Sequence, residues 1–289
     1  IGWRFTYTIA GGLGIVVLPF FIIIASSPHR VFTGDIDKSI ISSIVKRIVQ
    51  VFSIGPYRWI MFAAFFRSGG GFVTGFYIQT CFFKKFPDSD QKDTFSIMMA
   101  VYMLVCGPIS TIWGGWITDR FSKTDVGMPS RLCGLAQLLT IPFVCGTLLF
   151  ENFELALASL GFMFLIGECW ISPAIVMVQN SIPSVALGVS IGMFEFVGNM
   201  AGSLSTFLVG YADIHGEGIG TGVQRLDYII LAALCIAYTV SGLLFIFPIP
   251  KSFKNHMRYR PQSTIAHDPA TDHLIDTGLG KENSLIQSQ

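Results

Sequence analysis

The chain has 289 residues, of which 52% are hydrophobic and 13% charged, whereas a soluble domain carries about 25% charged residues. This deficit excludes an ordinary water-soluble fold. Nineteen Lys and Arg against eighteen Asp and Glu leave a formal net charge of +1, so no broad basic surface for nucleic acid is expected. The six cysteines lie in or at the ends of apolar runs without a CxxC pair, which indicates packing residues rather than metal ligands.

Seven segments are long and apolar enough to be membrane spans, for which about 20 mostly apolar residues are needed. They are residues 5–25, 58–83, 95–118, 131–150, 154–179, 185–211 and 226–248. Proline interrupts several of them, and bilayer helices tolerate this when neighbouring groups satisfy the freed backbone. The sequence therefore predicts an all-α integral membrane protein whose helices are kinked.

The distribution of Lys and Arg predicts how the chain crosses the membrane. With the C-terminus in the cytoplasm, thirteen basic residues lie on the inner side and five on the outer side, and Arg67 lies inside a span. This bias follows the positive-inside rule. We expect a multi-pass protein with a cytoplasmic C-terminus, in either the plasma membrane or an endolysosomal membrane.

Two further segments are interpreted from their composition, and the first residue from its identity. Residues 26–57 form a central loop in which apolar residues recur at helical spacing from Ile36 to Phe52 opposite basic residues. Such a helix lies on the inner membrane surface or packs against other cytosolic loops, and both interpretations stay open. Residues 249–289 are polar without a periodic apolar face, which predicts a disordered cytoplasmic tail. The first residue is Ile rather than Met, and we expect the chain to begin inside a longer protein.

Only three charged residues lie deep inside the predicted spans: Arg67, Glu168 and Glu195. A charge at the centre of a bilayer helix costs about 3 kcal/mol on insertion scales, so such residues usually face a cavity or one another. Small and polar residues follow each charge at helical spacing, and we expect these faces to bind substrate. The candidate substrate-binding residues are Arg67, Thr74, Tyr77, Glu168, Ser172 and Asn199, and Glu168 and Glu195 are the candidate proton-binding residues. A purely structural ion pair between helices is the alternative.

A family resemblance begins at the end of the third predicted span, which reads Gly114-Gly115-Trp116-Ile117-Thr118-Asp119-Arg120-Phe121-Ser122-Lys123. This string resembles the loop motif G-x-L-x-D-R-x-G-R/K of the major facilitator superfamily, with Ser122 in place of the second Gly. In that superfamily the loop joins helices two and three, and a weaker copy joins helices eight and nine. The resemblance implies that Asp119 and Arg120 gate the inner side, because such an Asp can pair with a basic residue and a helix N-terminus of the opposite bundle.

Within this superfamily the chain is similar to spinster-like lipid transporters. The shared strings are Phe72-Val73-Thr74-Gly75, Pro142-Phe143, Ile166-Gly167-Glu168, Ile182-Pro183 and Leu208-Val209-Gly210. The resemblance implies helices six to twelve of a twelve-helix protein. Residues 1–25 would then be helix six of the N-terminal bundle, the rest of which is missing from this chain, and residues 58–248 would be the C-terminal six-helix bundle.

The chain also departs from the family in ways that bear on the substrate. Ser184-Val185-Ala186-Leu187 stands where the family often has basic residues, and Ser205-Thr206 where a Pro is common. Arg67 has no recognised counterpart. These departures point to a substrate that has diverged from the family's lysophospholipids and sphingoid lipids.

The resulting expectation is a secondary active transporter that works by alternating access. It would carry out proton-coupled export or symport of a lysolipid, a sphingoid or another small amphipathic or anionic solute. Its partners would be that substrate, protons and membrane lipids, with no cofactor, no metal and no nucleic acid. The alternative is a structural membrane subunit that has the same fold and does not transport.

Two other classes of protein fit the sequence poorly. A retinal photoreceptor needs a Lys in its last span, and residues 226–248 contain none. An enzyme is disfavoured because no Ser/His/Asp or Cys/His set lies in the spans, and all five His lie in loops or the tail.

Overall fold

The computed structural model describes residues 3–24, 48–121, 125, 127–183, 186–215 and 223–259, and every regular element in these ranges is helical. The chain divides into two units, residues 1–43 and 44–289. The first unit contains α1 (Trp3–Ile24), a helix of 22 residues with large apolar side chains exposed along its length. Such a surface needs a lipid or protein partner.

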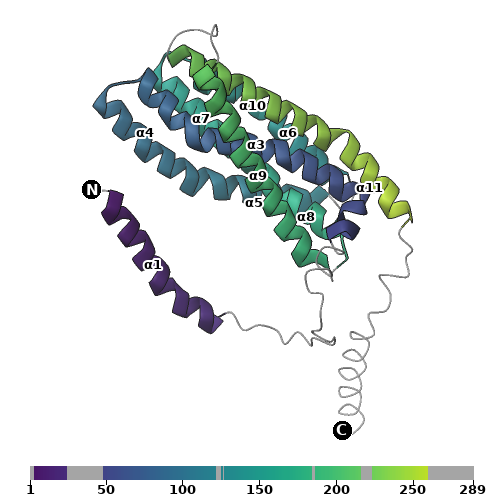
Figure 1. Ribbon diagram of the computed structural model, residues 1–289. Helices are drawn as coiled ribbons and strands as arrows, with labels where there is room; N and C mark the ends of the chain where they lie inside the picture. Colours follow the sequence, from purple (N-terminus) through teal and green to yellow (C-terminus); the bar gives the residue numbers. More distant parts are fainter. Residues whose placement is uncertain are drawn as a thin grey trace, which may run out of the picture. The chain divides into compact units, whose positions relative to one another are not determined.

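The second unit is a bundle of helices that run side by side (Figure 1). Two of its helices contain a short irregular turn: η1 is a turn of π-helix and η2 is a turn of 3₁₀-helix. The elements are α3 (Gly55–Lys85), α4 (Ser89–Val101), η1 (Tyr102–Cys106), α5 (Gly107–Phe121), α6 (Met128–Leu149), α7 (Phe153–Gly167), η2 (Glu168–Trp170), α8 (Ile171–Ser181), α9 (Leu187–His215), α10 (Val223–Ile246) and α11 (Pro248–Tyr259).

Helices lie in all seven segments that were expected to span a membrane, as far as these segments are described. Five of the helical stretches in the described residues are long and apolar enough to do so: Arg4–Ile24, Ser89–Phe121, Met128–Leu149, Phe153–Ser181 and Arg225–Asn255. The other two, α3 with 31 residues and α9 with 29, are long enough but less apolar. The chain is thus an all-α protein with the helices of a membrane-embedded one.

The helix α3 lies at the centre of the packing. It packs between α9 and α10, while α10 packs on α6, α6 packs on α7, and α5 packs on η2 and α8.

Glycines make several of these contacts close. A Cβ atom on Gly202 of α9 would overlap the ring of Phe72 on α3, and one on Gly134 of α6 would overlap Ile246 of α10. Gly198 of α9 likewise lies close to α3, since a Cβ there would be 3.1 Å from the Ser68 hydroxyl oxygen, whereas a Cβ on Gly188 or Gly192 would meet nothing within 4 Å.

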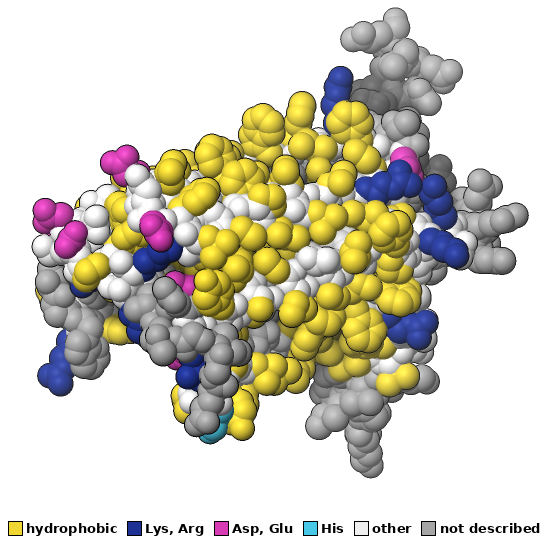
Figure 2. Space-filling view, turned by 90° about the horizontal axis from the view of Figure 1, so that it is seen from above, with side chains coloured by type: hydrophobic (Ala, Val, Ile, Leu, Met, Phe, Trp, Pro, Cys, Tyr) yellow, Lys and Arg dark blue, Asp and Glu magenta, His cyan; other side chains and the backbone are white. Residues whose placement is uncertain are grey.

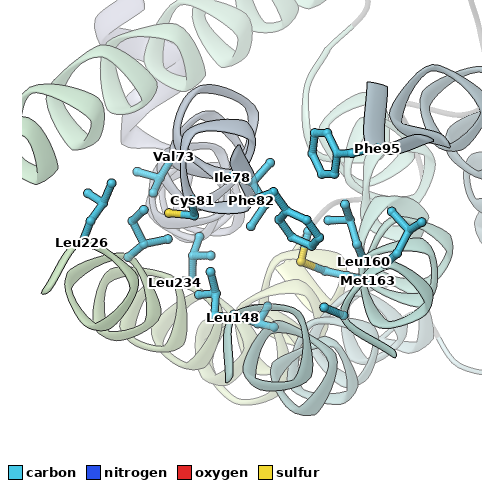
Figure 3. Close-up of a cluster of buried hydrophobic side chains, with 14 of the residues drawn as sticks. Val73, Ile78, Cys81, Phe82, Phe95, Leu148, Leu160, Met163, Leu226 and Leu234 are labelled. Carbon is cyan, nitrogen blue, oxygen red and sulfur yellow. The ribbon is translucent and has the colours of Figure 1, made fainter. Parts of the chain in front are cut away.

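Two apolar clusters form the core of the bundle. Along the helices, buried polar residues stand between members of the two clusters and form a polar layer: Arg67 on α3, Gln137 and Thr140 on α6, and Ser241 on α10. The cluster in Figure 3 joins α3, α4, α6, α7 and α10 through residues such as Ile78, Phe82 and Leu234. The second cluster includes Tyr57, Trp170 and Phe245. On the outside, hydrophobic side chains cover the middle of the face in Figure 2, and charged side chains gather toward its two ends. This pattern suits a bundle embedded in a bilayer.

Prolines explain where two of the long helices are irregular. Pro108 follows η1 and Pro173 follows η2, and proline has no N–H to donate to the carbonyl four residues earlier. The turn before each proline therefore departs from α-geometry. Because η1 packs on α7 and η2 packs on α5, the two irregular turns lie on neighbouring helices.

The predicted tail and central loop are described only in part. Residues 248–259 form α11, in which Ile249 and Phe253 are buried in the second cluster, so the expected disorder is wrong for the start of the tail. Residues 260–289 lie outside the described residues. Of the expected amphipathic helix, residues 48–53 are helical and Val51 is buried in the second cluster, and the remainder lies outside the described residues.

Candidate functional site

An ion pair between Arg67 and Glu168 lies in the polar layer. Arg67 Nη2 is 3.0 Å from Glu168 Oε1, and it also donates a hydrogen bond of 2.7 Å to the carbonyl oxygen of Gly167. The Arg67 side chain is 3% exposed and that of Glu168 is 27% exposed. Arg67 lies about 18 Å from the start of α3 at 1.5 Å per residue. The cation is therefore buried deep in the bundle, while the carboxylate keeps access to open space.

The hydrogen-bond pattern of η2 leaves a backbone carbonyl oxygen free to bind the guanidinium group of Arg67. The N–H of Ile171 bonds to the carbonyl of Glu168 instead of that of Gly167, its partner in a regular α-helix. The carbonyl of Gly167 can thus accept a bond from Arg67. Gly71, one turn beyond Arg67, leaves room for the group, because a Cβ there would lie 3.0 Å from Arg67 Nη1.

Two aromatic rings complete the surroundings of the cation. Arg67 Cζ lies 5.2 Å from the ring centroid of Trp170 and 5.0 Å from that of Tyr238. A guanidinium over an aromatic face is stabilised by cation–π attraction, which is stronger where water is excluded. Groups from α7, η2 and α10 therefore hold the positive charge that α3 carries.

The ion pair forms part of the wall of a cavity of about 400 Å³. Residues of α3, η1, α5, α7, η2 and α10 line it: Arg67, Ser68, Gly71, Phe72, Thr74, Gly75, Met103, Gly107, Met163, Phe164, Glu168, Trp170 and Tyr238. The wall is mostly apolar and has one charged corner. A small-molecule site typically combines an apolar lining with a few converging polar groups. The arrangement suits a ligand with an anionic head and an apolar body.

Several buried polar atoms of α3, α6 and η2 have no hydrogen-bond partner in the described part of the chain. They are Arg67 Nε, Trp170 Nε1, and both amide atoms of Gln137. Gln137 lies on α6 and is fully buried. Sequence reasoning missed it because it carries no charge, although a Gln within an apolar span was a usable signal.

The structure places three other candidate residues differently with respect to the cavity. Thr74 lines it, and its hydroxyl donates to the carbonyl of Gly70 at 3.1 Å. Tyr77 donates instead to the carbonyl of Thr206 on α9 at 3.0 Å, which ties α3 to α9. Ser172 lies against Gly115 of α5 and is not among the lining residues.

Glu195 and Asn199 do not join the Arg67–Glu168 pair. Both are exposed on α9, and Asn199 Nδ2 donates to the backbone carbonyl of Glu195 at 2.8 Å. Of the three charges that were expected at one depth, the bundle pairs Arg67 with Glu168 and leaves Glu195 on its outer surface.

Asp119 and Arg120 are exposed at the end of α5, and Ser122 and Lys123 lie outside the described residues. The structure instead shows an ion pair just beyond them, with Arg131 Nη1 at 2.8 Å from Asp125 Oδ2. Asp125 also accepts a bond of 2.9 Å from the Gly127 N–H. This bond, together with the charges of Arg131 and Lys254, lowers the pKa of the Asp125 carboxyl. Sequence reasoning missed Asp125 because it lies in a polar loop between spans.

Comparison with known proteins adds no relative to these observations: no protein-family model and no curated protein matches the chain. Its description therefore rests on the fold and the site. Together they define an all-α, membrane-embedded bundle with a buried ion pair at a largely apolar cavity.

Proposed function

We propose that the chain is part of a secondary active transporter of the major facilitator type, which moves a small anionic or amphipathic solute by alternating access. The observation that carries this proposal is the Arg67–Glu168 pair at the wall of the cavity. A buried charge is costly in a bilayer and is usually kept for function. The superfamily resemblance of residues 114–123 supports the same class, and the spinster-like resemblance suggests a lysolipid or sphingoid.

The site offers a way to couple proton binding to substrate binding. Glu168 and an anionic head group would compete for the one guanidinium, since Arg binds carboxylate and phosphate in the same geometry. A proton that binds Glu168 removes its charge and frees Arg67 for the substrate. Phe72, Met163 and Phe164 would then contact the apolar part of the solute.

The irregular turns support a site in the middle of the membrane. Transporters commonly build such sites from interrupted helices, whose free backbone groups point at the substrate or the coupling ion. Here η1 and η2 both contribute to the cavity wall, through Met103 and Glu168 respectively. The free Gly167 carbonyl that receives Arg67 is such a backbone group.

The proposed transporter has a defined orientation in the membrane and a gate on its inner side. The bias of basic residues favours a cytoplasmic C-terminus, in the plasma membrane or an endolysosomal membrane. The chain would supply helix six and the C-terminal bundle, and the partner bundle would close the cavity. Asp119 and Arg120 are exposed at the helix end, where they are free to meet that bundle as the inner gate. Glu195 and Asn199, exposed on α9, would face it as well.

A structural subunit without transport is the second candidate, favoured by the way Arg67 joins α3 to η2. The charge-free double variant Arg67→Gln/Glu168→Gln distinguishes the two, measured on reconstituted full-length protein. A transporter keeps its assembly in size-exclusion chromatography but loses uptake of labelled lysophosphatidylglycerol. A scaffold loses its assembly, and that result would contradict the proposal.

A further inference from the structure

Gln137 is a fully buried amide that makes no hydrogen bond in the described structure. Its relative exposure is 0%, and neither Oε1 nor Nε2 has a partner. Buried polar atoms in folded proteins are nearly always paired, so such an exception calls for a reason. One reason is a second arrangement of the site in which the amide is used.

The neighbours of Gln137 on α6 show which element it faces. Four residues earlier, Cys133 Sγ donates to the carbonyl oxygen of Trp170 at 3.5 Å. Three residues later, Thr140 lies beside Gly167, since a Cβ on that glycine would be 3.4 Å from Thr140 Cγ2 and 3.7 Å from Arg67 Nη2. Residues three and four apart share a helix face. Gln137 is therefore held against η2, the turn that binds Arg67.

The unpaired atoms on the two sides are chemically complementary. Arg67 Nε is a buried N–H donor without a partner, and Gln137 Oε1 is a buried acceptor without one. The other titratable groups against this layer are Glu168, Cys133, Cys169 and Tyr238. Glu168 carries the one carboxyl among these groups, so an amide oxygen is the natural neutral acceptor for the cation when that carboxyl is protonated or bound elsewhere.

We propose that Gln137 is the second acceptor for Arg67 and so a positioning residue of the site. When Glu168 takes up a proton, the guanidinium keeps its own charge and turns from the Glu168 carboxyl to Gln137 Oε1. The proton stays on Glu168, and no covalent bond other than that O–H changes. The inference builds on the coupling role proposed for Glu168, but the exchange of partners requires only the ion pair itself.

The test is a thermal-unfolding cycle on the purified chain in detergent, with Gln137→Leu made in two backgrounds. In the wild type Gln137→Leu removes an unpaired amide, so the midpoint should stay unchanged or rise. In a Glu168→Met background Arg67 depends on Gln137, so the same substitution should lower the midpoint by about 2 to 4 °C. A lowering of the midpoint in the Glu168→Met background alone is not expected of a residue that only fills space.

Two further substitutions, a rescue at Gln137 and a control at Thr147, are made in the same two backgrounds. Gln137→Glu should raise the midpoint in the Glu168→Met background, where it restores a charged partner, and lower it in the wild type, where it adds a second buried carboxylate. Thr147→Val, on the same helix with its hydroxyl bonded to the Phe143 carbonyl, should act equally in both backgrounds. Equal effects of Gln137→Leu in both backgrounds would overturn the inference. The cycle measures no transport, so its outcome is independent of whether the proposed function holds.

Discussion

Arg67 shows how a bundle can keep one cation in an apolar interior. The carboxylate of Glu168, the carbonyl of Gly167 and the rings of Trp170 and Tyr238 all contribute. The charge is thus shared among groups on three elements. Glu168 is the member most open to the cavity, with 27% of its side chain exposed. It is therefore the partner that a proton can reach first and that a competing anion can displace from Arg67.

Asp125, in the loop outside the spans, should contribute to stability in a pH-dependent way. Its pKa is lowered by the Gly127 N–H and by Arg131, so its contribution to stability is present above the ordinary carboxyl value of 3.8 and is lost as pH falls through the lowered value. Asp125→Ala should lower the unfolding midpoint at pH 7 by about 2 to 4 °C. The difference in unfolding midpoint between Asp125→Ala and the wild type should shrink as the pH falls below 3.8. Thermal unfolding across a pH series measures both.

Asp119→Ala provides the control for that series. Asp119 is an exposed acid six residues away and takes part in neither of the two ion pairs seen among the described residues. Its replacement should leave the unfolding midpoint at pH 7 close to that of the wild type. A gap for Asp125→Ala that stays constant from pH 7 to pH 3 would contradict the role given to the Asp125 carboxylate.

At the scale of elements, the contact between α5 and η2 decides where Glu168 lies. Gly114 makes that contact possible, because a Cβ there would overlap the backbone carbonyl of Cys169. Thus a glycine of the motif that resembles the superfamily loop has a packing role as well. The neighbouring Gly115 allows Ser172 to approach in the same way.

Gly114→Ala should therefore destabilise the bundle by about 1 to 3 kcal/mol, the usual cost of overpacking. The rigid backbone of Cys169 cannot yield as a flexible side chain would. Chemical unfolding in detergent measures the change. Gly192→Ala is the matched control, since a Cβ there meets nothing within 4 Å and alanine favours a helix. If both alanines stabilised the bundle equally, the close contact between α5 and η2 would be refuted.

The elements also show what could be predicted from the sequence. Helices were predictable because long apolar runs need little else, and Arg67 and Glu168 were visible as charges inside such runs. Their pairing was not, because Glu195 has the same depth and sequence periodicity does not give the rotation of a helix. Gly198 and Gly202 turn toward Ser68 and Phe72 of α3, and Glu195 is left exposed.

Other features were missed for different physical reasons. The start of α11 was taken for tail because its apolar residues are few, although Ile249 and Phe253 have the i, i+4 spacing of a buried helix face. Gln137 and Asp125 were missed because one is uncharged and the other lies outside the spans. Asp125 becomes noticeable only through its neighbour in space, Arg131.

The whole molecule combines a lipid-facing apolar surface, two apolar clusters and a polar layer that opens to a cavity. In a transporter this layer would be the place where substrate and proton meet, and the clusters above and below would keep water from crossing. The proposal requires that Glu168 be the group through which a pH gradient drives transport. Its removal should therefore abolish the coupling without unfolding the protein.

Uptake of labelled lysophosphatidylglycerol by reconstituted full-length protein, with and without an imposed pH gradient, measures this requirement. Wild-type protein should accumulate the lipid in response to the gradient, and Glu168→Gln should abolish that response. Glu154→Gln, an exposed acid at the start of the same span, should respond as the wild type does. Uptake by Glu168→Gln that still follows the gradient would contradict the role proposed for the ion pair.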